Sequence, residues 1–151
     1  KCNPLTFDFL SEKGFLTALI DINDDEPIYI INTHLQSCDF HRYDEYAVLQ
    51  LNELNYYLNK VIDKKYIVGG DFNIDINDFN KIITQNVKNV YHPDDPSIYI
   101  NFTTSHTSHC KRNGYEPLIF DYFISTIPIS KPLVIESSYS DHNPVLTYFN
   151  R

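Results

Sequence analysis

The sequence has no methionine, and it begins Lys1-Cys2-Asn3. We therefore expect that residue 1 is not the natural start and that the chain is part of a longer protein. No apolar run approaches the ~20 residues that a helix needs to cross a bilayer, so we expect no transmembrane segment. No signal peptide is visible either, and the compartment stays open.

Positive charge is scarce and scattered. The chain carries 12 basic and 20 acidic residues, which gives a formal net charge of −8. The tightest basic cluster is Lys111-Arg112. A protein that binds duplex nucleic acid usually presents a basic stripe, because Lys and Arg make the phosphate contacts. The charge balance therefore argues against tight binding of duplex DNA.

Cysteine is scarce as well: the chain has three, without a Cys-x-x-Cys pair, which argues against a structural zinc site. His106, His109 and Cys110 form a cluster with zinc-binding side chains. The cluster lies in a polar stretch without a fourth ligand at useful spacing, so a solvated loop is the favoured interpretation.

The residues that are abundant predict one globular α/β (α+β) domain over 1–151. Apolar residues make up 42% of the chain and aromatic residues 15%, enough to fill a core. The β-prone segments 15–22 and 28–31 flank a polar turn and predict an antiparallel hairpin. Apolar residues spaced by three or four predict a helix over 43–61, with Gln50 off its apolar face. That face comprises Ala47, Leu51, Leu54, Leu58 and Val61.

The second half of the chain is predicted to form short strands on either side of a long loop. Residues 66–68 predict a buried strand, and Gly69-Gly70 allows a sharp exit from it. A short helix is expected around Phe79. Residues 91–117 are polar and rich in turn residues, which predicts a loop. Three further strands are expected at 118–124, 133–136 and 145–149, for a total of about six strands and two helices in a layered sandwich.

Four short motifs place carboxylate, carboxamide or imidazole groups within or just after these apolar runs. They are Asn32-Thr33-His34-Leu35-Gln36, Gly69-Gly70-Asp71-Phe72-Asn73, Phe120-Asp121-Tyr122 and Ser140-Asp141-His142. A sheet presents catalytic side chains at one rim in this way. Metal-assisted attack of water on a phosphate ester needs a base, a cation and donors to the phosphate oxygens, and this set contains groups suited to each task.

Each motif also has a simpler interpretation. Asp71 and Asn73 are common turn residues after Gly-Gly, and His34 on its own is more often structural. Asp121 is the sharpest signal, because a carboxylate inside an apolar run needs a partner, and His142 is the candidate. The run that starts at Asp71 resembles a calcium loop but has isoleucines where Gly and Glu are required, so an EF-hand is rejected.

Together the motifs resemble the endonuclease/exonuclease/phosphatase (DNase-like) superfamily, and within it the neutral and bacterial sphingomyelinases. Two further pieces carry this resemblance, Lys13-Gly14-Phe15 and Tyr115-Glu116-Pro117, and it spans nearly the whole chain. It implies the carboxy-terminal half of a four-layer α/β sandwich with a mixed, largely antiparallel sheet. The amino-terminal half, whose Asn and Glu bind the essential metal, has no match before Lys13.

The resemblance also implies a role for each site residue. His142 would be the general base, oriented by Asp121, and Asp141 would face the metal. Asp71 would stabilise the attacking water or the transition state, while Asn73 would contact the phosphate. The residue expected to donate to the phosphate or the leaving group is His34. The cofactor would be Mg²⁺, with Mn²⁺ or Co²⁺ as alternatives.

The implied substrate is a phosphodiester, sphingomyelin in a membrane surface, cut to ceramide and phosphocholine. A nuclease or a phosphoinositide phosphatase of the same superfamily is the first alternative. A truncated, non-catalytic fragment is the second: the intact motif residues weigh against it, and the missing metal ligands weigh for it.

Overall fold

The computed structural model describes residues 13–22, 26–37, 45–61, 63–76, 78–79, 99–101 and 118–149. Several predictions from the sequence fall outside this part of the chain. They concern the three cysteines, the His106–Cys110 cluster, the Tyr115-Glu116-Pro117 piece and most of the 91–117 loop.

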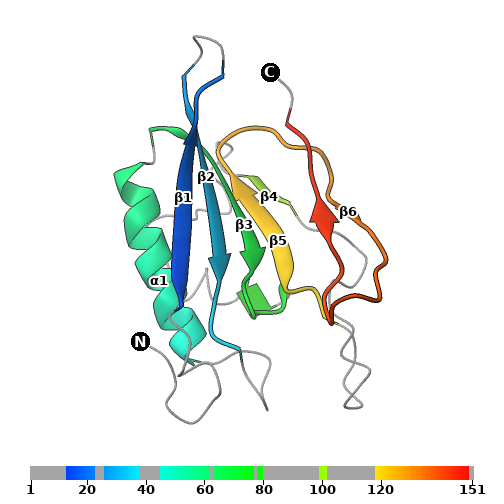
Figure 1. Cartoon of the computed structure of the whole chain (residues 1–151). Helices are drawn as coiled ribbons and strands as arrows, with labels where there is room; N and C mark the ends of the chain where they lie inside the picture. Colours follow the sequence, from blue (N-terminus) through cyan, green and yellow to red (C-terminus); the bar gives the residue numbers. More distant parts are fainter. Residues whose placement is uncertain are drawn as a thin grey trace.

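One mixed sheet dominates the described residues. Its five strands lie in the order β1-β2-β3-β5-β4 (Figure 1). Only β2 and β3 are parallel, and the other neighbours are antiparallel, so the predicted mixed, largely antiparallel sheet is confirmed. The strands are β1 (Gly14–Ile20), β2 (Ile28–His34), β3 (Lys65–Asp71), β4 (Tyr99–Asn101) and β5 (Asp121–Ser125).

The hairpin predicted for the first part of the chain is β1 and β2. The two strands pair over their whole length, from Gly14 opposite His34 to Ile20 opposite Ile28. β2 therefore runs three residues further than the predicted end at Ile31, and His34 is its last residue. The β-branched and aromatic residues of Ile28–Ile31 favour this extended conformation.

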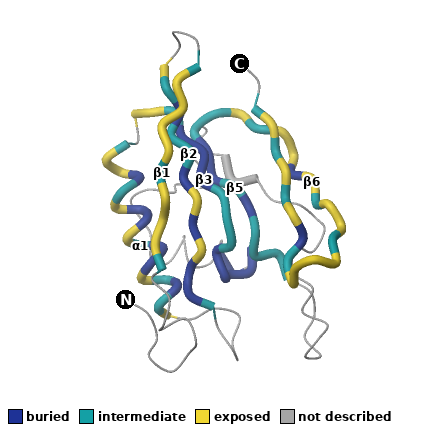
Figure 2. The backbone as a smooth tube through the Cα atoms, viewed as in Figure 1, coloured by how far each residue is buried: buried dark blue, intermediate teal, exposed yellow. Residues whose placement is uncertain are grey.

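The helix α1 (Glu45–Lys60) packs against one face of the sheet (Figure 1). Its predicted apolar face is buried, and only Val61, just beyond the helix, is partly exposed. From the sheet, this core includes residues of β2, β3 and β5, and Figure 2 shows buried stretches along these strands. These core residues are Ile31, Tyr66, Val68, Tyr122 and Ile124.

Two polar residues of α1 share this buried face. Gln50 was expected on another face and is instead buried, because its side chain accepts a hydrogen bond from the loop after β2. Asn55 is buried too, and among the described residues neither its Oδ1 nor its Nδ2 has a hydrogen-bond partner.

The sheet face opposite α1 is here called the open face. It carries a row of apolar side chains: Leu16, Ile20, Ile30, Ile67 and Phe123. Side chains alternate between the two faces of a strand, and paired residues point the same way. The pairing of Ala18 with Ile30, Ile30 with Ile67, and Gly69 with Phe123 therefore puts all five on one side. At the edge, Leu16 remains 72% exposed.

The end of the chain forms a second, two-stranded sheet of β6 (Leu133–Val134) and β7 (Val145–Leu146). Both strands are shorter than predicted, and β5 begins at Asp121 rather than 118. β4 lies inside the predicted loop, so that part of the loop prediction is wrong. The described residues thus hold seven strands and one α-helix longer than a turn, and none of their helices is long and apolar enough to span a bilayer.

Candidate active site

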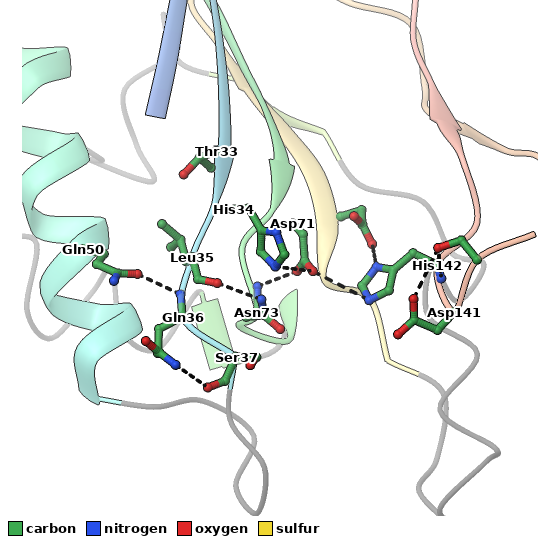
Figure 3. A network of polar contacts seen from close by, with 12 residues as sticks. Thr33, His34, Leu35, Gln36, Ser37, Gln50, Asp71, Asn73, Asp141 and His142 are labelled. Atoms are coloured by element: carbon green, nitrogen blue, oxygen red, sulfur yellow. Dashed lines mark hydrogen bonds and ion pairs between the residues drawn. The ribbon is translucent and has the colours of Figure 1, made fainter. Parts of the chain in front are cut away.

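Three strands of the sheet bring their polar end residues into one row. His34 ends β2, Asp71 ends β3, and Asp121 begins β5. The register pairs His34 with Asp71 and Asp71 with Asp121. Paired side chains point to the same side of a sheet, and here that side is the open face, away from the α1 core. The row therefore lies at one end of the open face. Figure 3 shows two of its members, His34 and Asp71.

His142 reaches this row from the loop before β7. Its Nδ1 lies 2.8 Å from Oδ2 of Asp121, within hydrogen-bond distance. The two residues that the sequence analysis paired are therefore in contact, although 21 positions separate them. Both side chains are largely shielded, with 27% and 18% of their surfaces exposed.

Asp71 occupies the centre of the row. Its Oδ2 lies 3.6 Å from Nε2 of His142 and 3.6 Å from Nε2 of His34. The other carboxylate oxygen, Oδ1, accepts a hydrogen bond from the backbone N–H of Asn73 at 2.8 Å. A chain of polar contacts thus runs from Asp121 through His142 and Asp71 to His34 (Figure 3).

Asn73 is buried beside this row and has a left-handed backbone, with φ of 49°. Its Nδ2 donates to the carbonyl oxygen of Leu35 at 2.9 Å, and the N–H of Leu35 donates to the carbonyl oxygen of Asp71. The local turn bond is therefore made by the side chain of Asp71, whereas the side chain of Asn73 joins the segments that follow β2 and β3. The other hydrogen of Nδ2 is not used in this bond.

Asp141 lies next to His142 but is exposed. Its Oδ1 accepts a hydrogen bond from the Ser140 hydroxyl at 3.3 Å, and Ser140 Oγ accepts one from the N–H of His142 at 3.2 Å. The structure therefore brings together His34, Asp71, Asn73, Asp121 and His142, and it leaves Asp141 at the edge of this group.

The charges of the site shift two pKa values. The hydrogen bond to Asp121 raises the pKa of His142 to about 9, although burial opposes the rise, and the charge of Asp71 adds to it. Burial raises the pKa of Asp71 above its ordinary value, and the nearby charge of Asp121 raises it further, while His142 opposes this. Without further charge at the site, His142 is an imidazolium at neutral pH.

The donor set suits a divalent cation. Ligand atoms of Asp71, Asp121 and His142 all lie within 4.8 Å of one another. Two of these groups are carboxylates, and hard cations such as Mg²⁺ prefer oxygen ligands. Burial and the charge of Asp121 raise the pKa of Asp71, which means that they disfavour its ionised form. A cation beside the two carboxylates would offset this effect, because positive charge favours their ionised forms.

One residue that supports the site was not predicted from the sequence. Gln50 of α1 accepts a hydrogen bond from the backbone N–H of Gln36 through its Oε1, at 2.7 Å. This bond fastens the segment after His34 to the helix (Figure 3). The available signal was a polar residue between Ala47 and Leu54, at helical spacing from both.

No protein-family profile and no curated protein matches the sequence. Solved structures do match. A beta toxin variant from Staphylococcus aureus, with bound magnesium ions, is 22% identical, with a TM-score of 0.63 over 96% of this chain and 60% of that one. Sphingomyelinase C from Streptomyces griseocarneus is 18% identical, with a TM-score of 0.59 over 96% and 60%.

A humanised D. rerio TDP2 is 17% identical, with a TM-score of 0.64 over 91% of this chain and 60% of that one. This chain thus spans about 60% of the length of the structures it matches. At such identities the likeness concerns the course of the backbone. The chain therefore shares the fold of these structures.

Proposed function

We propose that this chain is part of a divalent-metal-dependent phosphodiesterase of the sphingomyelinase type, which cuts sphingomyelin to ceramide and phosphocholine. The observation that carries the proposal is the row of contacts from Asp121 through His142 to Asp71 and His34. Four ionisable side chains from three strand ends and one loop meet there, and phosphodiester hydrolysis uses such groups as base, charge stabiliser and donor.

In this proposal His142 is the general base. Asp121 holds Nδ1, which leaves Nε2 directed toward Asp71 at the centre of the row. Nε2 takes a proton from water as the water oxygen bonds to phosphorus. The bond between phosphorus and the ceramide oxygen breaks, and that oxygen leaves as the hydroxyl of ceramide after it takes up a proton.

The other residues act on the phosphate and the water. Asp71 orients the attacking water and stabilises the transition state. His34 is 59% exposed, so it is accessible to a bound phosphate or to the leaving group, to which it donates. Asn73 presents the second hydrogen of Nδ2 to a phosphate oxygen while the first holds Leu35 in place.

The metal would be Mg²⁺, or alternatively Mn²⁺ or Co²⁺, held by carboxylates of the row with Asp141 facing it. A bound divalent cation supplies positive charge that offsets the phosphate charge in the transition state and opposes protonation of His142. We propose further that the chain is the carboxy-terminal half of the catalytic domain. The amino-terminal half would then supply the Asn and Glu ligands that the resemblance implies.

The choice of a phospholipid substrate at a membrane surface rests on two observations. Sphingomyelinase C is among the matching structures, and the net charge of −8 disfavours duplex nucleic acid. TDP2 and a cytolethal distending toxin also match, which keeps a nuclease or another phosphatase as the alternative. Parallel assays with sphingomyelin, plasmid DNA and an inositol phosphate separate these substrates.

The test is release of phosphocholine from sphingomyelin vesicles by the natural full-length protein, with and without Mg²⁺. We expect release that depends on Mg²⁺ and falls by roughly 10²–10⁴-fold in His142→Ala, because the base is lost. Glu136→Gln, an exposed change before the same loop, is the control and retains activity. Equal turnover by His142→Ala and the unmodified protein would refute the mechanism. Folded protein without activity on any of the three substrates would favour the non-catalytic alternative.

A further inference from the structure

The loop that carries His142 is exposed in its middle and becomes buried toward its end. Residues 138–141 are all exposed, and Tyr139 is fully so. Asn143, directly after His142, is only 8% exposed. A buried carboxamide at this point needs hydrogen-bond partners, since an unpaired one costs roughly 1–3 kcal/mol. The hydrogen-bond partner of the Asn143 side chain indicates which segments the residue holds together.

The side chain of Asn143 closes the loop. Its Oδ1 accepts a hydrogen bond from the backbone N–H of Ser137 at 3.0 Å. Next to this bond, the N–H of Ile135 donates to the carbonyl oxygen of Pro144 at 2.9 Å. The strands that flank the loop pair only two residues each, so the sheet alone restrains it weakly. The Asn143 carboxamide therefore supplies a hydrogen bond between the two ends of the loop, where the backbones of β6 and β7 no longer pair.

Asn143 also faces the space beside the site. A cavity of about 320 Å³ lies between the open face and the start of β7, and both Asn143 and Asp121 line it. Asp121 is held in place by the sheet, whereas His142 belongs to the loop. The imidazole ring of His142 makes the contact with Asp121. The 2.8 Å contact thus joins a rigid element to a loop whose position depends on its closure.

We propose that Asn143 is the positioning residue for His142: by bonding Ser137 it holds the loop so that the imidazole meets Asp121. A displacement of about 1 Å at a catalytic group can cost on the order of 10²-fold in rate. The kinetic part of this inference rests on the proposed function. The positional part concerns only the contact between His142 and Asp121.

The first test observes that contact directly, in the full-length protein and without substrate. The probe is the low-field NMR signal of the His142 Nδ1 proton, recorded at low temperature and mildly acidic pH. Asn143→Leu removes the acceptor and keeps a buried side chain of similar size, and Asn143→Ala is the second variant. We expect both to lose the signal or move it upfield, with far-UV circular dichroism unchanged. Asn143→Asp keeps a side-chain oxygen for Ser137 and is expected to restore the signal.

Thr147→Val is the matched control. It removes the hydrogen bond from Thr147 to the carbonyl oxygen of Ser130, 2.8 Å long, at the other end of the same two strands. The His142 signal should survive this change. An unaltered signal in both Asn143→Leu and Asn143→Ala would overturn the proposal. Equal loss in Thr147→Val would also overturn it, because any weakening of the strand pair would then suffice.

The second test uses the full-length protein. Asn143→Leu should lower kcat for the phosphodiester substrate by at least about 10-fold and leave KM nearly unchanged, since the substrate contacts stay in place. Asn143→Asp should recover much of kcat. A raised KM at full kcat would contradict a positioning role. If the protein hydrolyses none of the phosphodiesters, the proposed function fails, and the NMR result still decides the inference.

Discussion

The imidazole of His142 lies between two carboxylates, with Nδ1 2.8 Å from Asp121 and Nε2 3.6 Å from Asp71. This arrangement explains why its pKa rises to about 9 against the opposing effect of burial. It also sets a condition for catalysis, because a base has to be neutral to accept a proton.

Replacement of Asp121 by asparagine should lower the pKa of His142 from about 9 toward its ordinary value of 6.5, since the bond to this carboxylate is the largest cause of the rise. NMR titration of the His142 ring protons measures the change. Asp141→Asn is the control: Asp141 is exposed and the weakest of the named causes, so its loss should lower the pKa much less. Equal shifts in the two variants would contradict the assigned pairing.

The same pKa predicts how stability varies with pH. A histidine whose pKa is higher in the folded state contributes stability that is fully present below about 6.5 and is lost as the pH rises through about 9. The rise corresponds to roughly 3 kcal/mol at most. Urea unfolding of the unmodified chain and of His142→Gln, from pH 6 to 10, measures it. The unmodified chain should be the more stable at pH 6 by an amount that shrinks toward pH 10, and a constant difference would refute the prediction.

At the scale of elements, the row of site residues depends on close contact between parallel strands β2 and β3. Gly70, opposite Thr33 in this pair, has φ of 144°, a conformation that L side chains rarely adopt. A methyl group at this position would overlap the carbonyl oxygen of Thr33. The glycine therefore allows β2 and β3 to stay paired up to their last residues, where His34 lies opposite Asp71.

Gly70→Ala should lower the free energy of unfolding by roughly 2–4 kcal/mol, through both backbone strain and the clash. Gly14→Ala is the matched control, because nothing lies within 4 Å of a Cβ added there. Its effect should stay within about 0.5 kcal/mol. Chemical denaturation of both variants makes the comparison, and similar losses would show that the register at Gly70 is not restrictive.

At the scale of the whole molecule, the two faces of the main sheet have different roles. The face toward α1 holds the buried core, and the open face is apolar in its middle and polar at the end where the site lies. The site residues therefore lie on the side of the sheet away from the core, beside an apolar row whose β1 members Leu16 and Ile20 are exposed. Leu16 on β1 is 72% exposed, whereas Leu54 on α1 is fully buried.

Truncation of these two leucines should separate the faces. Leu54→Ala should destabilise the chain by about 2–5 kcal/mol, because it removes buried methyl groups and leaves a cavity. Leu16→Ala should cost less than about 1 kcal/mol, since the side chain is already in water. Thermal unfolding of this chain provides both values. A loss for Leu16→Ala as large as for Leu54→Ala would mean that the open face is covered.

Local patterns accounted for much of this architecture. The hairpin and the apolar face of α1 were predictable because alternation and helical spacing record which side chains meet the core. β4 was not, because its three residues form a strand only through hydrogen bonds to β5. Gln50 was misplaced for a similar reason: a buried glutamine is tolerated only where a distant backbone N–H, here that of Gln36, meets it.

Local alternation fixes which chemical groups stand at the strand ends, because it puts His34, Asp71 and Asp121 out of step with the core residues beside them. How those groups meet depends on the arrangement of the strands and loops in space. Register aligned three strand ends, and a loop closed by Asn143 brought His142 to Asp121. Which face a side chain takes and which secondary structure it favours depend on residues close in the chain. Strand register and loop closure depend instead on contacts between residues far apart in the chain.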